Sequence, residues 1–426
     1  MWDVIWVNAN LATMNGPQPY GAIRSGAIAA ENGRISFVGS MAELPSEVGS
    51  IARTVHDVGG AWITPGLVDS HTHVIYAGDG RRDFEMRIQG ASRAEIYGSG
   101  GGVPGIVRRT REASDDTLFV EAARRIGELQ AHGVTTLESK SGFGLDLETE
   151  LRQMRLSREL GRALPVTVVS TFLGAHGLAP EYAGRPDDYI DFLADTILPA
   201  AVAEGVVDAV DGFCDNVGFN HAQIRRLFDR AKSFGLPVRL HADQYSDFSA
   251  GALAAEHKAL VADHLEYASE STVAAMAKAG TVAGLLPGAN YTLRETRIPP
   301  VELFRRYGVR MAIATNSNPS SSPTNSPPMV MNLACTLFRI TPEEALAGFT
   351  INGARALAME TDRGSLEVGK LADLAFWDIA DPADLSYLLA ANRCIAVVKA
   401  GTVVHEAARH KPIGRPHEKA AVAARR

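Results

Sequence analysis

The chain has 426 residues and a formal net charge of −7, and 46% of its residues are hydrophobic. A chain of this length can bury a large core, and its acidic balance gives no electrostatic case for binding nucleic acid or an anionic membrane surface. Its cysteines, Cys214, Cys335 and Cys394, form neither a CxxC pair nor a disulfide framework. We therefore expect a cytoplasmic protein that acts on a small molecule.

The first 62 residues predict short strands separated by turns. Residues 3–14, 26–39 and 54–66 are rich in residues that favour strands and are bounded by Gly, Pro or Asn. The acidic Asp3 interrupts the first apolar run, which never reaches the roughly 18 apolar residues of a membrane span. We expect a small β unit here, with no secretory leader and no membrane anchor.

From residue 63 to 356 apolar strand-like runs alternate with amphipathic segments. Strand followed by helix, repeated over ~250 residues, is typical of an α/β protein with a parallel (β/α)8 barrel. Strand-like segments return after residue 356, so we expect residues 1–62 and 357–408 to form one composite β-sandwich beside the barrel. The tail, residues 409–426, has few large apolar residues and is expected to be flexible.

Histidines end several of the predicted barrel strands. His71 and His73 lie two residues apart and therefore point to the same face of a strand, and His176, His241 and His264 end three later runs. The carboxyl ends of barrel strands meet at one rim, where barrel active sites lie. Taken singly, each histidine is more simply a packed core or capping residue. Taken together, they predict a metal centre, because neutral imidazole binds zinc and iron well.

Motifs spread along nearly the whole chain keep the order and spacing of one enzyme family: GLVDSHTHVIYAG, IQGAS, GVTTLESKSGFGL, TFLGAHGLAPEY, LHADQ, ADHLEY and ATNSNP. They resemble the imidazolonepropionase family of the amidohydrolase superfamily. The resemblance implies a barrel flanked by a composite β-sandwich, one zinc or iron ion, and a homodimer. It also implies hydrolysis of a small cyclic substrate, 4-imidazolone-5-propanoate, to N-formimino-L-glutamate in histidine degradation.

The same resemblance implies roles for individual residues. His264 would polarise the scissile carbonyl or transfer a proton, and Gln244 would bind substrate and the attacking water. The loop at 317–323 offers Asn318, Ser320 and Ser321 for recognition of the ring, although these serines would equally suit a helix cap. The implied metal ligands are His71, His73 and His241, with His176 in contact with the substrate ring.

Five positions depart from the family pattern. Asn316 stands where the family has an aspartate as fourth metal ligand; an amide oxygen can coordinate a metal, but it adds no charge and cannot act as a base. Gly80 replaces an arginine that binds the substrate carboxylate. Phe143 and Arg93 replace tyrosines, and Ser320 replaces a loop glycine.

Two interpretations of these changes remain open. Either Arg81 or Arg93 replaces the missing arginine and the family substrate is retained, or the substrate is a related cyclic amide with another side chain. Two rival classes also remain: another cyclic amidohydrolase or deaminase of the superfamily, and a non-hydrolytic binding protein or isomerase of the same fold.

Overall fold

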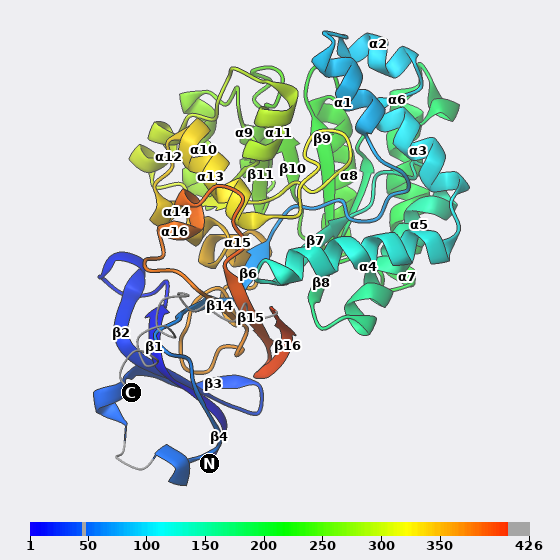
Figure 1. The fold of residues 1–426 in the computed structure, drawn as a ribbon. Coiled ribbons are helices and arrows are strands. Elements are labelled where there is room, and N and C mark those ends of the chain that lie inside the picture. The colour runs from blue at the N-terminus through cyan, green and yellow to red at the C-terminus, as the bar shows by residue number, and fades with distance from the viewer. Residues whose placement is uncertain (45–47, 408–426) are drawn as a thin grey trace, which may run out of the picture.

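The computed structural model describes residues 1–44 and 48–407, so the predicted flexible tail at 409–426 lies outside the described residues. Two parts lie against each other (Figure 1). The larger is a set of parallel strands surrounded by helices, and the smaller is a sheet built from both ends of the chain. Within the described residues, no helix is long and apolar enough to cross a membrane.

In the described part of the chain, eight parallel strands form the larger sheet, each paired with the next in chain order. The last strand returns to the first, because Thr72 and Ser317 form a parallel bridge just beyond the two strand ends. The predicted (β/α)8 barrel is confirmed. Its strands are β6 (Leu67–Asp69), β7 (Val134–Lys140), β8 (Thr167–Ala175), β9 (Ala209–Cys214), β10 (Leu240–Ala242), β11 (Val261–His264), β12 (Val282–Leu285) and β13 (Met311–Ile313).

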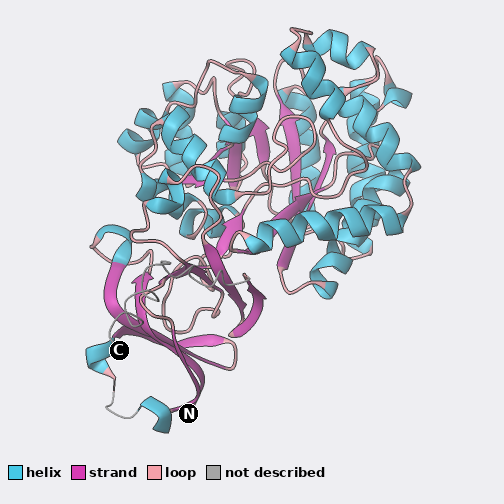
Figure 2. Cartoon of the chain, viewed as in Figure 1, coloured by secondary structure: helices cyan, strands magenta, loops and turns pink. Residues whose placement is uncertain are grey.

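Helices cover the outside of the barrel and extend above its carboxyl rim (Figure 2). Several begin at a capping residue that the sequence supplies, as at Ser114, Asp146 and Asn220, whose side chains accept from a backbone N–H of the first turn. The helices of the barrel part are α1 (Arg81–Ile88), α2 (Arg93–Gly98), α3 (Gly102–Glu112), α4 (Asp115–Ala131), α5 (Leu147–Ala163), α6 (Pro186–Phe192), α7 (Leu198–Ala203), α8 (His221–Ser233), α9 (Ala250–Glu256), α10 (Glu270–Ala279), α11 (Pro287–Leu293), α12 (Val301–Tyr307), α13 (Pro327–Phe338), α14 (Pro342–Gly348) and α15 (Ile351–Ala356).

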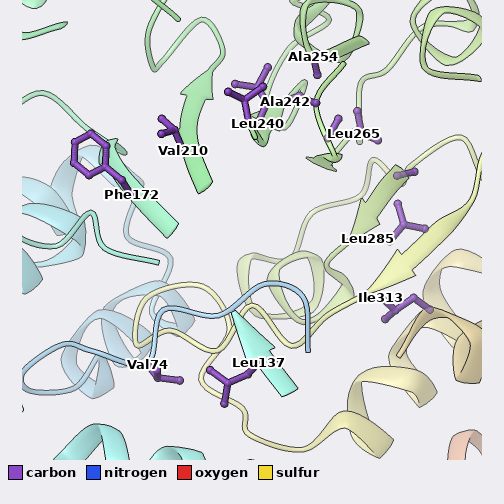
Figure 3. Packing of buried hydrophobic residues seen from close by; sticks show 14 of the residues in the cluster. Val74, Leu137, Phe172, Val210, Leu240, Ala242, Ala254, Leu265, Leu285 and Ile313 are labelled. Carbon is purple, nitrogen blue, oxygen red and sulfur yellow. The ribbon is translucent and has the colours of Figure 1, made fainter. Parts of the chain in front are cut away.

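A layer of apolar side chains between the strands and the helices holds the barrel together. Leu137, Val210, Leu240, Leu285 and Ile313 come from five different strands and are fully buried in one cluster (Figure 3). Side chains alternate between the two faces of a strand, so their neighbours in sequence point into the barrel. This alternation is what brings polar residues to the inner face, where the site is found.

The smaller part is a sheet in which both chain ends take part, in the order β16-β15-β14-β5-β1-β2-β3, with β4 also pairing with β1. Apolar clusters cover both faces of β1. The predicted joining of the two ends is confirmed, and hydrogen bonds link these strands into one continuous sheet. Its strands are β1 (Trp2–Ala12), β2 (Ala22–Glu31), β3 (Arg34–Ser40), β4 (Ala52–Asp57), β5 (Trp62–Pro65), β14 (Leu374–Trp377), β15 (Cys394–Lys399) and β16 (Thr402–Glu406); the short helix α16 (Asp384–Tyr387) lies between β14 and β15.

Truncating a side chain in the apolar layer between the strands and the helices should leave a cavity and destabilise the fold. Replacing Leu285 by Ala should lower the free energy of unfolding by about 2–5 kcal/mol, because the surrounding side chains cannot close the space. The matched control is Val120→Ala on α4, where the side chain is 64% exposed and the change should stay within about 0.5 kcal/mol. Urea unfolding followed by circular dichroism measures both; equal shifts would show that this layer does not carry the stability assigned to it.

Candidate metal centre and active site

Three buried imidazoles meet at the carboxyl end of the barrel. His71 and His73 follow β6, and their Nε2 atoms lie 3.3 Å apart. His241, in the middle of β10, brings a third ring, and the ligand atoms of the three residues all lie within 4.8 Å of one another. Ring nitrogens that converge in this way need a shared proton or a cation between them, which is the arrangement expected of a metal site.

Two of these imidazoles have a carboxylate behind them. His71 Nδ1 lies 3.0 Å from Asp263 Oδ2, and His241 Nδ1 lies 3.2 Å from Asp211 Oδ2. A carboxylate at Nδ1 favours the tautomer that leaves the Nε2 lone pair free, and metal-binding histidines commonly have such a partner. The donor set and its surroundings therefore fit a divalent cation.

Two buried cationic side chains, Lys140 and Arg239, form ion pairs with Asp211 and with a further buried carboxylate, Glu138. Lys140 Nζ lies 2.6 Å from Asp211 Oδ2 and 2.9 Å from Glu138 Oε2, and Arg239 Nε lies 2.9 Å from Glu138 Oε1. All four side chains are at most 1% exposed. Our sequence analysis missed this layer, although charged residues at alternate positions within apolar strands, as in Glu138 and Lys140, were a visible signal.

Burial keeps the histidines neutral. It lowers the pKa of His71 and His73 well below the usual range, and it lowers the pKa of His176 and of His241 to about 4. Removal from water penalises the charged form of an imidazole. At pH 7 each ring therefore carries a free lone pair, as a metal ligand or a hydrogen-bond acceptor must.

A cavity of about 460 Å³ opens in front of these imidazoles. His73 and His241 line it, whereas His71 lies behind them and is fully buried. Most residues predicted for the site are brought together in its wall. They are Phe143, His176, Gln244, His264, Arg93, Asn316, Asn318, Ser320 and Ser321.

Comparison with known proteins agrees with this geometry. Residues 62–404 match the amidohydrolase family. The chain is 52% identical over 407 residues to an imidazolonepropionase of Cupriavidus necator, covering 95% of this chain and 97% of that relative. It is 51% identical over 385 residues to an imidazolonepropionase of Pseudomonas aeruginosa, covering 90% and 95%. The chain belongs to the imidazolonepropionase family.

Solved structures of other enzymes share the fold of this chain. A triazine hydrolase variant superposes with a TM-score of 0.76, at 17% identity, over 95% of this chain and 94% of that one. An adenosine deaminase from Xanthomonas campestris with bound zinc superposes with a TM-score of 0.69, at 18% identity, over 94% and 92%. Identities this low establish the shared fold alone.

His264 reaches the cavity through an unusual backbone. It ends β11, and Asp263 beside it already points into the barrel toward His71. Regular alternation would turn the next side chain outward. Instead His264 has a φ of +80° and Leu265 a φ of +70°, and the His264 ring lies 5.4 Å from that of His241 between centroids. The left-handed backbone thus lets two successive polar side chains serve one site.

Asn316, where the resemblance led us to expect an aspartate, lines the same cavity as His73 and His241. Its backbone N–H donates to the carbonyl of His71 at 2.9 Å, and its side chain is 3% exposed. Asn318 Nδ2 donates to Asn316 Oδ1 at 3.0 Å. The structure thus brings position 316 to the cluster, and coordination of a metal by its amide oxygen stays a prediction.

The loop after β13 is organised by Asn318. Its Oδ1 accepts from the backbone N–H groups of Ser320 and Ser321 at 2.9 and 2.8 Å, and its Nδ2 donates to Ser321 Oγ at 3.0 Å. These bonds engage the amide of Asn318 within the loop itself. Recognition of substrate by Asn318, Ser320 and Ser321 stays a prediction.

The missing arginine at position 80 has a steric counterpart. A Cβ added to Gly80 would lie 1.9 Å from the backbone oxygen of Pro319. The loop after β13 therefore occupies the space from which an arginine at this position would have to extend.

The two candidate replacements have different positions. Arg81 begins α1, its side chain is 86% exposed and bonded to Asp79, and it is absent from the cavity wall in the described structure. Arg93 lines the cavity, with its guanidinium 5.0 Å and 5.1 Å from the ring centroids of Tyr245 and Tyr97. Arg87, which our sequence analysis missed, lines the cavity as well.

The contact between Gly80 and Pro319 yields a prediction. Gly80→Ala should lower the melting temperature and reduce activity, since the new methyl group must displace a backbone carbonyl, and overpacking of this kind costs about 1–3 kcal/mol. Gly98→Ala is the matched control, because a Cβ there meets no atom within 4 Å. Thermal unfolding of both variants decides; if Gly80→Ala is as stable as Gly98→Ala, the loop does not lie against position 80.

Proposed function

We propose that this protein hydrolyses the ring of 4-imidazolone-5-propanoate to N-formimino-L-glutamate, using one zinc or iron ion held by His71, His73 and His241. The observation that carries this proposal is the convergence of three neutral, buried imidazoles, two of them backed by carboxylates, in a member of the imidazolonepropionase family. Imidazole is a good ligand for either metal. When bound, the ion supplies Lewis-acid chemistry and lowers the pKa of water toward about 7.

The cavity wall offers contacts for each part of this substrate. His176 Nδ1 lies 3.0 Å from the carbonyl oxygen of Gly142, so its Nε2 lone pair is free to accept from a ring N–H. The Phe143 ring lies 5.4 Å from that of His176 between centroids and gives a flat apolar surface to the substrate ring. We propose that Arg93, with Arg87, binds the propanoate carboxylate in place of an arginine at position 80.

His264 and Gln244 line the same cavity as His73 and His241. We propose that Gln244 orients the substrate and the attacking water through its amide, and that His264 either polarises the scissile carbonyl or transfers the proton. Asn316 completes the wall beside the imidazoles but cannot take a proton near neutral pH. Much of the proton transfer therefore falls to His264.

The smaller predictions follow from the same family membership. We propose that the protein is a homodimer and that it acts in the cytoplasm, where the products of amino-acid breakdown are used. Sedimentation equilibrium of the purified chain gives the oligomeric state directly.

The decisive experiment is the loss of 4-imidazolone-5-propanoate absorbance with purified, metal-loaded protein, and metal content measured on the same sample. Turnover at the ordinary enzyme scale of about 1–10³ per second, with one ion per chain, is expected. His71→Ala should lose both the metal and the activity. A protein that holds one ion and does not open this ring, but opens a related cyclic amide, would replace the proposed substrate.

Position 316 can be tested by restoring the family residue. Asn316→Asp should bind zinc more tightly, because a carboxylate adds a negative charge next to three neutral ligands, and its oxygen can still accept from Asn318 Nδ2. Competition with a chelator measures the affinity. Asn316→Ser, which keeps no carbonyl oxygen, is the comparison; affinities unchanged in both variants would place residue 316 outside the coordination sphere.

The proposed carboxylate contact is tested by removing one charge. Arg93→Met should raise KM for the imidazolone by about 10- to 100-fold with a small effect on kcat, since a hydrogen bond to a charged group contributes about 1.5–3 kcal/mol. Arg81→Met should leave KM nearly unchanged, because that side chain lies outside the cavity wall. The opposite pattern would assign the contact to Arg81.

A further inference from the structure

A buried carboxylate that has no part in the chemistry above lies behind His264. Glu266 follows His264 by two residues, its side chain is 3% exposed, and its Oε1 lies 3.8 Å from His264 Nδ1. Glu266 Oε2 and His264 Nδ1 are both buried, and neither has a hydrogen-bond partner among the described residues. Buried polar atoms without partners are costly, and the carboxylate oxygen near the unpartnered Nδ1 is Oε1 of Glu266, so the two side chains are placed to interact.

Among the groups around Glu266, His264 is the one placed to donate a hydrogen bond to its carboxylate. Arg297 Nε donates to the backbone oxygen of Glu266 at 3.2 Å, so this guanidinium bonds to the main chain of Glu266. Burial, and next to it the charge of Glu266, raise the pKa of Glu295, which makes Glu295 a repelling neighbour. In the described structure, His264 is the ion-pair partner within 4.0 Å of the Glu266 carboxylate.

We infer that Glu266 is a positioning residue that accepts the hydrogen of His264 Nδ1 and thereby fixes the tautomer whose Nε2 lone pair faces the cavity. His264 lines the cavity and its Nδ1 is buried, which leaves Nε2 as the ring nitrogen available to substrate. In this tautomer a neutral His264 accepts a proton and does not donate one. The inference rests on the proposed function, and it assigns His264 the proton transfer, not the polarisation of the carbonyl.

His264 and Glu266 together account for the proton that moves from water to the ring nitrogen during ring opening. As the oxygen of water bonds to the ring carbonyl carbon, His264 Nε2 takes the proton that water gives up. The resulting imidazolium is stabilised by Glu266, in the way a carboxylate supports the histidine of a hydrolytic triad. His264 then gives the proton to the ring nitrogen as the C–N bond breaks, and it returns to the neutral form.

This pair also explains how the site can work with an amide at position 316. Asn316 cannot accept a proton, whereas His264 with Glu266 can. The present separation of 3.8 Å between Nδ1 and Oε1 exceeds a hydrogen bond. Catalytic hydrogen bonds of this type are often long until substrate binds, so the distance is compatible with the role.

Kinetics of a double-mutant cycle test the inference. Glu266→Ala should lower kcat on the order of 10²-fold, with KM and metal content unchanged, since general acid–base catalysis typically contributes 10²–10⁴-fold. Glu266→Gln, which keeps a hydrogen-bond acceptor without the charge, should recover part of the loss. In a His264→Asn background, Glu266→Ala should cause no further loss. An equal loss in both backgrounds, or no loss in the first, overturns the role.

A second measurement needs no substrate. In metal-loaded protein with nitrogen-15 histidine, the His264 signals, assigned through the His264→Asn spectrum, should show a protonated Nδ1 and an unprotonated Nε2. Glu266→Ala should lose this preference, and the fold is checked in the same spectrum. A wild-type ring protonated at Nε2 refutes the inference. If the wild-type protein does not open the imidazolone ring, the proposed function is wrong. The spectrum still shows whether Glu266 fixes the His264 tautomer.

Discussion

The return of the last barrel strand to the first is the contact on which the site depends. Beyond β13 the N–H of Asn316 donates to the carbonyl of His71, and the N–H of His73 donates to the carbonyl of Ser317, both at 2.9 Å. These bonds fix the register between segments at opposite ends of the barrel sequence. A slip of one residue would turn His71 and His73 away from the interior, because the side-chain period is two. Closure of the sheet and assembly of the imidazole cluster are therefore the same event.

Much of this arrangement was predictable from the sequence, because it follows from periodicity. The spacing of His71 and His73 sets their common face, and the alternation of strand-like and helical segments gives the barrel that brings His241 to the same rim. The residues that escaped prediction include Glu138, Lys140 and Arg239, which lie buried behind the imidazoles. His264 was predicted from its place at the end of a strand-like run, but the positive φ that turns its ring toward the cavity is revealed by no local sequence pattern.

Residues around the cavity mouth show a second limit of sequence reasoning. Arg81 is adjacent to Gly80 in the chain and was, with Arg93, one of the two predicted replacements for the arginine expected there, but α1 begins at Arg81 and its side chain bonds to Asp79. Arg87 is on the same helix, and at 3.6 residues per turn it projects to a different side, where the cavity lies. The contact between Gly80 and the oxygen of Pro319 joins two distant segments, which one sequence cannot disclose.

The shared sheet has a consequence for synthesis of the chain. β5 pairs directly with β14, with Trp62 opposite Trp377, so β5 lacks this neighbour until all the barrel strands have been synthesised. Chains generally fold from the amino end as they emerge. Here every barrel strand is made before that neighbour arrives, and the open edge of β5 meanwhile offers unpaired backbone groups to other chains. In this fold, β14 covers the strand edge through which β5 could otherwise pair with another chain.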